Sequence, residues 1–416
     1  MNYSQAYKHN HAGKPLYLRA VILFMCLIFT LPLFLTGCGS EETAVEKHAD
    51  YGDYGALAAK ALASRYPYRK AYSETEKSAG TYIKNEFEEL GYKVEEQTFS
   101  SAGNTGTSTN YIVRIPGTGL MFLDSDESYI KESRQVIVGA HYDTEYGTED
   151  AAAYPDFNGI QDNACGIGCL LTIAKEIRSE NNGYDVILVA FGAGDDSYTG
   201  ARAFADSMTE SEISSTDAMY CIESIYAGDK LYANAGWNSL VPGQKYEMRR
   251  KLYEAYDVVY ENQLSSSNGV DLLYNECGQF LDVDGDGDSE VFREVTTTLS
   301  DYVPFDNAGI PIVFFESYDY NYSTISEMKE TKNLHLQENG GLIRRTNYDS
   351  ISTLLESMAE GQLELRINNT AFIIIEAILK GAHDSISVQA YKAGETIAPP
   401  VHVSVTPTPA ATSVQK

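Results

Sequence analysis

Short apolar runs alternate along this chain with longer segments whose apolar residues recur at helical spacing. Glycine and polar residues bound the short runs, which is typical of buried parallel strands, whereas the longer segments predict helices. The predicted strands span 92–99, 110–115, 135–140, 185–191, 218–222 and 311–315. The predicted helices span 73–90, 164–179, 199–208, 246–260, 350–358 and 363–382. This alternation predicts an α/β fold with a doubly wound, mostly parallel mixed sheet flanked by helices.

The helix predicted at 73–90 carries recognisable signals at both of its ends. Ser73 is the expected N-cap, and Glu76 stands three residues later as its capping-box partner. Gly91 is the expected stop.

The first 37 residues have the pattern of a secretion signal. A basic stretch ends at Arg19, and the apolar run Ala20–Leu35 that follows is too short for a comfortable membrane span. The run ends in Leu-Thr-Gly-Cys38, which resembles the bacterial lipobox, where the cysteine becomes the lipidated first residue. We therefore expect a signal peptide over 1–37 and a membrane-anchored lipoprotein outside the cytoplasmic membrane. The alternative is an uncleaved anchor helix.

The remaining chain divides by composition. Residues 38–50 are polar and predict a tether, and residues 51–383 predict one folded body with an insertion at about 262–293. The Pro- and Thr-rich residues 384–416 predict a disordered tail. Cys165 and Cys169 lie four residues apart on a predicted helix, where their expected role is packing.

The formal net charge of −28 restricts the possible partners. A strongly acidic surface disfavours nucleic acid and anionic lipid. The sequence does not indicate an oligomeric state.

Acidic residues and one histidine follow the ends of three predicted strands. His141 follows the first, Asp195 and Asp196 follow the second, and Glu223 follows the third, while Asp162 precedes a predicted helix. Ligands of open α/β sheets bind beyond the carboxyl ends of the strands, so we expect these side chains to converge. Carboxylates with one imidazole are ligands that suit a divalent cation such as zinc.

On these residues the chain resembles the M28 family of zinc peptidases, a secreted or membrane-attached set of aminopeptidases and carboxypeptidases. The resemblance covers most of residues 51–383. Its most specific pieces are His141-Tyr142-Asp143, Asp162-Asn163-Ala164-Cys165-Gly166, Asp195-Asp196, and Ser300-Asp301 followed by Gly309-Ile310-Pro311.

The resemblance implies roles for individual residues. His141 would bind the first metal, and Asp162 would bridge two metals. Glu223 would complete the first site at a position where the family usually has Asp. Asp196 and Asp195 would be the second-metal ligand and the general base, at two positions where the family usually has Glu.

Asp143 would orient a ligand, and Asp301 would lie behind the ligands or contact substrate. The last family ligand is a histidine in a His-Thr-x-x-Asp segment, where this chain has Arg345. A guanidinium cannot bind zinc, so Arg345 would instead neutralise spare carboxylates or hold a substrate carboxylate. His335 is the candidate replacement ligand. This set of implied ligands predicts one firmly bound zinc ion and a second ion that is bound weakly or not at all.

A separate acidic segment resembles a calcium-binding loop of the EF-hand type. Oxygen-bearing side chains alternate along it, at Asp282, Asp284, Asp286, Asp288 and Glu290. Its twelfth position is Arg293 rather than Glu, and the alternative is an acidic surface turn.

The leading expectation is a metal-dependent exopeptidase, namely an aminopeptidase that acts on peptides with a zinc-activated water. Two alternatives remain open at this point. One is a catalytically inactive M28-like lipoprotein that binds peptides or has a structural role in the envelope, and the other is a single-zinc enzyme similar to glutaminyl cyclase.

The lipobox-like segment generates the first prediction. Cys38→Ala should leave the protein unprocessed and unlipidated, because the thiol that receives the lipid is lost. Metabolic labelling with a radioactive fatty acid, followed by immunoprecipitation, measures this. Equal labelling of the natural protein and the variant would contradict the assignment.

Overall fold

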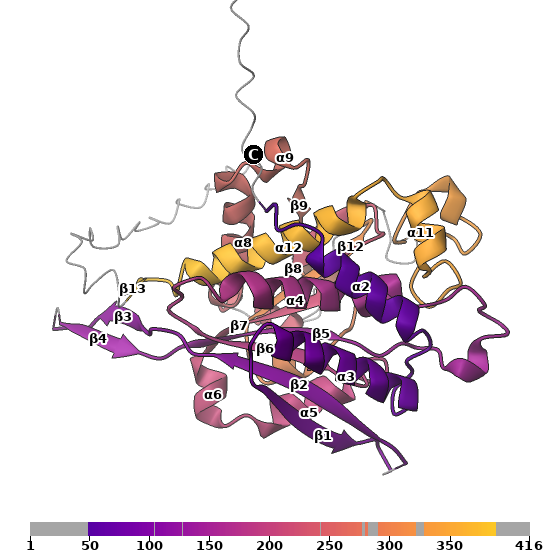
Figure 1. The fold of residues 1–416 in the computed structure, drawn as a ribbon. Coiled ribbons are helices and arrows are strands. Elements are labelled where there is room, and N and C mark those ends of the chain that lie inside the picture. The colour runs from indigo at the N-terminus through magenta and orange to yellow at the C-terminus, as the bar shows by residue number, and fades with distance from the viewer. Residues whose placement is uncertain are drawn as a thin grey trace, which may run out of the picture. The chain divides into compact units, whose positions relative to one another are not determined.

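The computed structural model describes residues 49–387 except 104, 127, 242, 277–278, 282–289 and 322–327. An eight-stranded mixed sheet in the order β1-β2-β6-β5-β7-β12-β8-β9 forms its centre (Figure 1). Neighbouring strands among β6, β5, β7 and β12 are parallel, whereas β2 and β8 run antiparallel on either side of these four. The predicted fold class is therefore confirmed. The strands are β1 (Val94–Ser100), β2 (Thr107–Ile115), β5 (Gln135–His141), β6 (Asp185–Phe191), β7 (Thr216–Glu223), β8 (Lys230–Asn234), β9 (Leu272–Leu273) and β12 (Ile312–Tyr318).

Helices cover both faces of this sheet (Figure 1). The larger apolar core lies under α2 (Tyr54–Arg65), α3 (Glu74–Glu89), α4 (Cys165–Ile177), α8 (Arg250–Glu261) and α12 (Gln362–Leu379). A smaller core lies on the other face, under α5 (Thr199–Ser207), α6 (Glu210–Ser215) and α10 (Val303–Asn307). Both faces of the central strands are thus buried, which explains why these strands are apolar at nearly every position.

Smaller elements complete the described part of the chain. A three-stranded sheet contains β3, β4 and β13, and a two-stranded sheet contains β10 and β11. Their bounds, with those of the remaining helices, are β3 (Leu120–Leu123), β4 (Tyr129–Glu132), β10 (Gln279–Leu281), β11 (Glu290–Phe292), β13 (Ser385–Ser387), α7 (Lys245–Met248), α9 (Leu264–Ser267), α11 (Ile351–Ser357), η1 (Thr148–Asp150), η2 (Ile160–Ala164), η3 (Trp237–Leu240) and η5 (Leu334–Leu336). No helix among the described residues is long and apolar enough to cross a membrane.

The strand register brings the carboxyl ends of the central strands to one edge. His141 pairs with Phe191 at the ends of β5 and β6, and Glu223 pairs with Glu316 between β7 and β12. Residues that directly follow these strands therefore meet at the same edge, as parallel pairing requires.

The predicted elements all occur, with small shifts at their ends, but one segment predicted as a single helix forms two helices. The helix predicted at 246–260 is interrupted at Arg249, which separates α7 from α8. Arg249 is buried and donates to Glu294 Oε2 at 2.6 Å, so a long-range ion pair decides where the helix starts. The pattern also missed α2, β8 and the small sheets.

The capping of α3 is partly as predicted. The Ser73 side chain accepts a hydrogen bond from Glu76 N at 3.1 Å, which confirms the N-cap. The Glu76 carboxylate, however, does not accept a hydrogen bond from the backbone N–H of Ser73, as a capping box would require. It accepts from Tyr72 N at 2.5 Å, Ser108 Oγ at 2.6 Å and Ala193 N at 3.0 Å. Glu76 is thus a buried acid that fixes the segment after β6, and burial raises the pKa of Glu76 to about 8.

Several predictions made from the sequence lie outside the described residues. They are the signal peptide, lipidation at Cys38, most of the tether, most of the tail predicted at 384–416, and the loop positions Asp282, Asp284, Asp286 and Asp288. Within the described part, β13 pairs with β3, so the sheet structure continues past the predicted end of the body at residue 383. Cys165 and Cys169 are buried and unbonded to other cysteines, in agreement with a packing role.

Arg69, between α2 and α3, joins the segments that follow β5. Its guanidinium is fully buried and donates to Tyr142 O at 2.5 Å, Asn158 O at 2.7 Å and Gly159 O at 2.7 Å. One side chain thereby satisfies three main-chain carbonyls that flank the strand end and the turn leading to Asp162.

Arg69→Met should lower the free energy of unfolding by about 3–5 kcal/mol, because buried carbonyls would lose their donor. Arg114→Met is the matched control, since Arg114 makes an exposed ion pair with Glu95 at 3.2 Å and should cost about 1 kcal/mol or less. Urea denaturation measures both. Equal effects of the two substitutions would show that Arg69 has no special role.

Candidate metal centre

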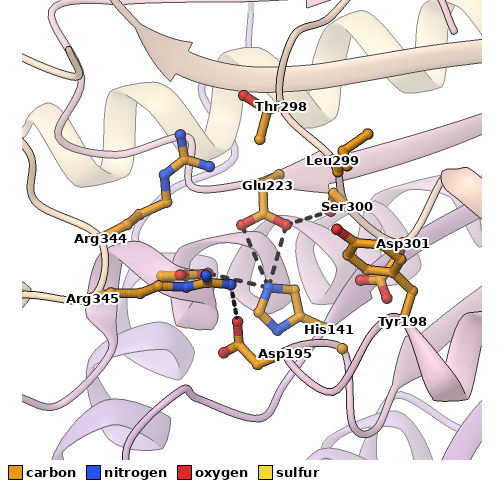
Figure 2. A pocket seen from close by; sticks show the side chains of 12 residues that line it. His141, Asp195, Tyr198, Glu223, Thr298, Leu299, Ser300, Asp301, Arg344 and Arg345 are labelled. Atoms are coloured by element: carbon orange, nitrogen blue, oxygen red, sulfur yellow. Dashed lines mark hydrogen bonds and ion pairs between the residues drawn. The ribbon is translucent and has the colours of Figure 1, made fainter. Parts of the chain in front are cut away.

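The carboxyl ends of β5 and β7 bring one imidazole and one carboxylate together. His141 ends β5 and Glu223 ends β7, and His141 Nε2 lies 3.3 Å from Glu223 Oε2. Asp162 comes from η2, directly before α4, and its Oδ1 lies 3.2 Å from the same nitrogen. All three residues are buried, and Figure 2 shows Glu223 facing His141 across the pocket.

Hydrogen bonds on both sides of Asp162 fix its position. Asp349 accepts from Gln161 N at 2.7 Å and from Asp162 N at 3.1 Å. Asn163 Nδ2 donates to Ile222 O at 2.8 Å, which ties the turn to the strand that ends at Glu223. The spacing between Asp162 and Glu223 therefore follows from bonds made by their neighbours.

Asp143 lies on the other side of the imidazole. Its Oδ1 is 3.4 Å from His141 Nδ1, and its carboxylate accepts from Gly194 N at 2.7 Å and Asp195 N at 3.1 Å. A Cβ at position 194 would lie 2.4 Å from His141 Cβ, so only glycine allows the segment after β6 to run this close. Asp143 is thus positioned to orient His141, the role that the resemblance implied, and leaves Nε2 facing Asp162 and Glu223.

The two adjacent acids after β6 point in different directions. Arg345 Nη2 donates to Asp195 Oδ1 at 2.8 Å, and Asp195 Oδ2 is buried without a hydrogen-bond partner. Asp196 instead accepts from the Tyr72 hydroxyl at 2.5 Å and does not line the pocket. The structure therefore does not bring Asp196 together with His141, Asp162 and Glu223, and the geometry gives no support to the prediction that Asp196 is a metal ligand. The reason is that the hydroxyl of Tyr72, which precedes α3, binds Asp196, while Asp195 faces the pocket.

Arg345 stands at the rim of the pocket, beside the cluster. Its side chain is 57% exposed, and its Nε lies 3.4 Å from Glu145 Oε2. His335 lies on η5, is exposed and does not line the pocket. The geometry consequently gives no support to His335 as a replacement ligand.

The wall opposite Arg345 carries Ser300 and Asp301 (Figure 2). Ser300 Oγ donates to Glu223 Oε2 at 2.6 Å. Asp301 is only 1% exposed, and neither of its carboxylate oxygens has a hydrogen-bond partner. Burial raises the pKa of Asp301 to about 8; the charge of His141 opposes this shift, and the neighbouring carboxylates add to it.

The pocket between these walls has a volume of about 210 Å³. Arg344 also lines it, but its guanidinium is engaged, with Nε 3.1 Å from Glu330 Oε1 and Nη2 3.7 Å from Glu316 Oε2. Most of the charge that faces the pocket is therefore negative.

The donor set of His141, Asp162 and Glu223 fits a divalent cation. Their ligand atoms all lie within 4.8 Å of one another. Two carboxylates share a single imidazole nitrogen, and Asp162 Oδ1 is buried without a hydrogen-bond partner. Burial alone would lower the pKa of His141, yet the surrounding carboxylates raise it well above its usual value. The cluster thus lacks positive charge, which a metal ion would supply.

The comparisons with known proteins agree with this reading. A family model described as peptidase family M28 matches residues 120–339, and the chain belongs to that family. The alkaline phosphatase isozyme conversion protein of Escherichia coli (strain K12) is 25% identical over 275 residues, which cover 65% of this chain and 73% of that protein.

Solved structures share the fold at low sequence identity. A zinc aminopeptidase from Bacillus subtilis has a TM-score of 0.54 at 13% identity, covering 82% of this chain and 98% of its own. A glutaminyl cyclase from an Acidobacteriales bacterium has a TM-score of 0.52 at 17% identity, covering 83% of this chain and 100% of its own. At these identities the likeness concerns the fold.

Sequence reasoning missed residues that position the cluster rather than belong to it. Arg69 binds main-chain groups far away in sequence, and nothing local to it signals this. Asp349 entered only as the last residue of the segment that resembles His-Thr-x-x-Asp, and its bonds to the backbone at Gln161 and Asp162 were not foreseen. Ser300 was noticed only as part of a motif, and Tyr198 was not singled out although it lines the pocket beside Asp301 (Figure 2).

Proposed function

We propose that the protein is an aminopeptidase that works with one zinc ion held by His141, Asp162 and Glu223. The observation that carries the proposal is this buried three-residue donor set in a chain of the M28 family, two of whose members, His141 and Glu223, end parallel strands. When bound, zinc would lower the pKa of a water molecule and polarise the peptide carbonyl. The remaining steps fall to side chains of this chain.

Asp195 is the proposed general base. Its Oδ2 is buried in the pocket and free of hydrogen bonds, so it can accept a proton from water. Its Oδ1 is held by Arg345, which fixes the carboxylate and limits its rotation. The guanidinium also faces the pocket, where it can stabilise negative charge that develops on the carbonyl oxygen.

Arg345 is the reason for proposing a single zinc ion. A guanidinium about 4 Å from a divalent cation would repel it by roughly 8 kcal/mol at an effective dielectric of about 20, twice the value for two unit charges. Arg345 supplies one fixed positive charge to Asp195 without contributing a ligand.

Two alternatives make different demands on the same pocket. Cyclisation of an N-terminal glutamine would need the substrate's own amine as nucleophile, and the fold neighbour named a glutaminyl cyclase supports including it in the assay. A peptide-binding or structural lipoprotein would bind substrate without turnover.

The lipobox-like Cys38 supports a further proposal, that the enzyme is tethered outside the cytoplasmic membrane and acts on peptides there.

The zinc count gives one prediction. The natural protein should bind one zinc ion per chain. His141→Ala should bind none, because the two carboxylates that remain are too few ligands to hold zinc firmly. Arg345→His should raise the count towards two, since the repelling charge is replaced by a ligand near Asp162 and Asp195. Elemental analysis after dialysis measures this, with Arg114→His as a surface control. Two tightly held zinc ions in the natural protein would refute the role of Arg345.

The adjacent acids give a second prediction. Asp195→Asn should lower kcat on an aminoacyl p-nitroanilide by about 100-fold or more, as expected for loss of a general base. Asp196→Asn should change it by less than about threefold, because its amide oxygen can still accept from Tyr72.

The assay for this prediction uses the zinc-loaded protein, with and without a chelator, and a glutaminyl peptide as the second substrate. Greater loss in Asp196→Asn than in Asp195→Asn would reverse the assignment of the base. Cyclised product without hydrolysis would replace the aminopeptidase by a cyclase, and no turnover of any substrate would reject the enzymatic proposal.

A further inference from the structure

Asp301 is a buried acid that its surroundings leave without a partner. Glu223 accepts from Ser300, and Asp143 and Asp349 each accept from two main-chain amides. Asp301, by contrast, has two buried oxygens and no hydrogen bond to either, although it lines the pocket. A buried carboxylate without donors is costly, so Asp301 would gain from a partner that comes from outside the described residues.

The charges of the pocket indicate what kind of partner fits. Arg345 and Asp195 lie on one side of His141 and Glu223, and Asp301 lies with Tyr198 on the other side (Figure 2). Arg344, the second arginine of the pocket, is engaged by Glu330 and Glu316. On the side that holds Asp301, no arginine among the described residues of the pocket is left to balance the negative charge of this acid. On the opposite side, the guanidinium of Arg345 balances Asp195.

A second metal ion is a poor match for this demand. Metal binding needs several ligands, and Asp301 does not belong to either group of clustered ligand atoms found in the described residues. An ammonium group needs only acceptors, because it carries its own three donors. Two unpartnered carboxylate oxygens suit that group.

We propose that Asp301 receives the α-ammonium group of the substrate's N-terminal residue. The inference rests on the proposed function and adds the direction in which the peptide lies. Asp301 directly follows Ser300, which donates to the ligand Glu223, so a cation at Asp301 sits close to the metal centre. In an amino acid the ammonium is separated from the carbonyl by a single carbon. An ammonium held by Asp301 would therefore leave the carbonyl close to the metal centre. The rest of the peptide then extends past Arg345.

This assignment explains why the site would release N-terminal rather than C-terminal residues. A substrate carboxylate at Asp301 would face a like charge in a buried position, whereas an ammonium would form a desolvated ion pair. A blocked N-terminus would leave Asp301 buried and unpaired, which is the usual basis of strong discrimination against the wrong ligand.

The test compares L-leucine p-nitroanilide with its desamino analogue on the zinc-loaded full-length protein. The natural protein should prefer the amine, and Asp301→Asn should lower kcat/KM for the amine by about 100-fold, the usual effect of losing one partner of a buried charge pair. The value for the desamino analogue should change by less than about threefold, so the preference collapses. Asp306→Asn, on α10 in the same segment and hydrogen-bonded to Asn238 N, is the matched control and should keep the preference.

A binding measurement separates this inference from the proposed catalysis. Calorimetry with L-leucinamide and with 4-methylpentanamide, on both zinc-loaded and chelator-treated protein, reports recognition of the amine without turnover. Tighter binding of the amine by the natural protein, lost in Asp301→Asn, supports the assignment even where no substrate is hydrolysed.

Two results would overturn it. One is an equal loss for both compounds in Asp301→Asn, which would indicate a structural role. The other is an unchanged preference for the amine in that variant. If the natural protein hydrolyses nothing but still distinguishes the two amides through Asp301, the aminopeptidase proposal fails and the inference about Asp301 stands.

Discussion

An excess of buried negative charge around one imidazole is the constraint on which the site depends. Asp143, Asp162 and Glu223 all lie within 3.4 Å of a ring nitrogen of His141, at the edge where the parallel strands end. In a low-dielectric interior such a cluster is stable only with compensating positive charge. The surrounding carboxylates raise the pKa of His141, so a proton on its ring can supply part of this charge, and a zinc ion would supply more.

The surrounding structure distributes the rest of the compensation. Arg345 donates to Asp195, and Arg344 is engaged by two buried glutamates behind the pocket. Arg69 donates to three carbonyls and thereby fixes the segments that carry the ligands. Each arginine has partners of its own, and the Arg345 guanidinium lies beside the three residues that could hold a metal ion. Both carboxylate oxygens of Asp301 are buried, and the described residues donate a hydrogen bond to neither of them.

The fold and the meeting of three acidic or histidine side chains could be predicted from the sequence because their signals are local. The runs that became β5, β6 and β7 are apolar throughout, and parallel strands align their carboxyl ends, so His141, Asp162 and Glu223 could be expected to meet. Asp195 and Asp196 could not be told apart in this way, because both follow the same strand. Their directions depend on Tyr72 and Glu76, which hold the segment from more than a hundred residues away in sequence.

The central claim is that Arg345 takes the place of a second metal ion beside a single zinc site. Crystals of the natural protein grown with zinc, measured for anomalous scattering on both sides of the zinc absorption edge, test it most directly. One peak bounded by His141 Nε2, Asp162 and Glu223, with the Arg345 guanidinium still on Asp195, is the predicted result. Two peaks about 3.5–4 Å apart, with Arg345 displaced from Asp195, would contradict the account.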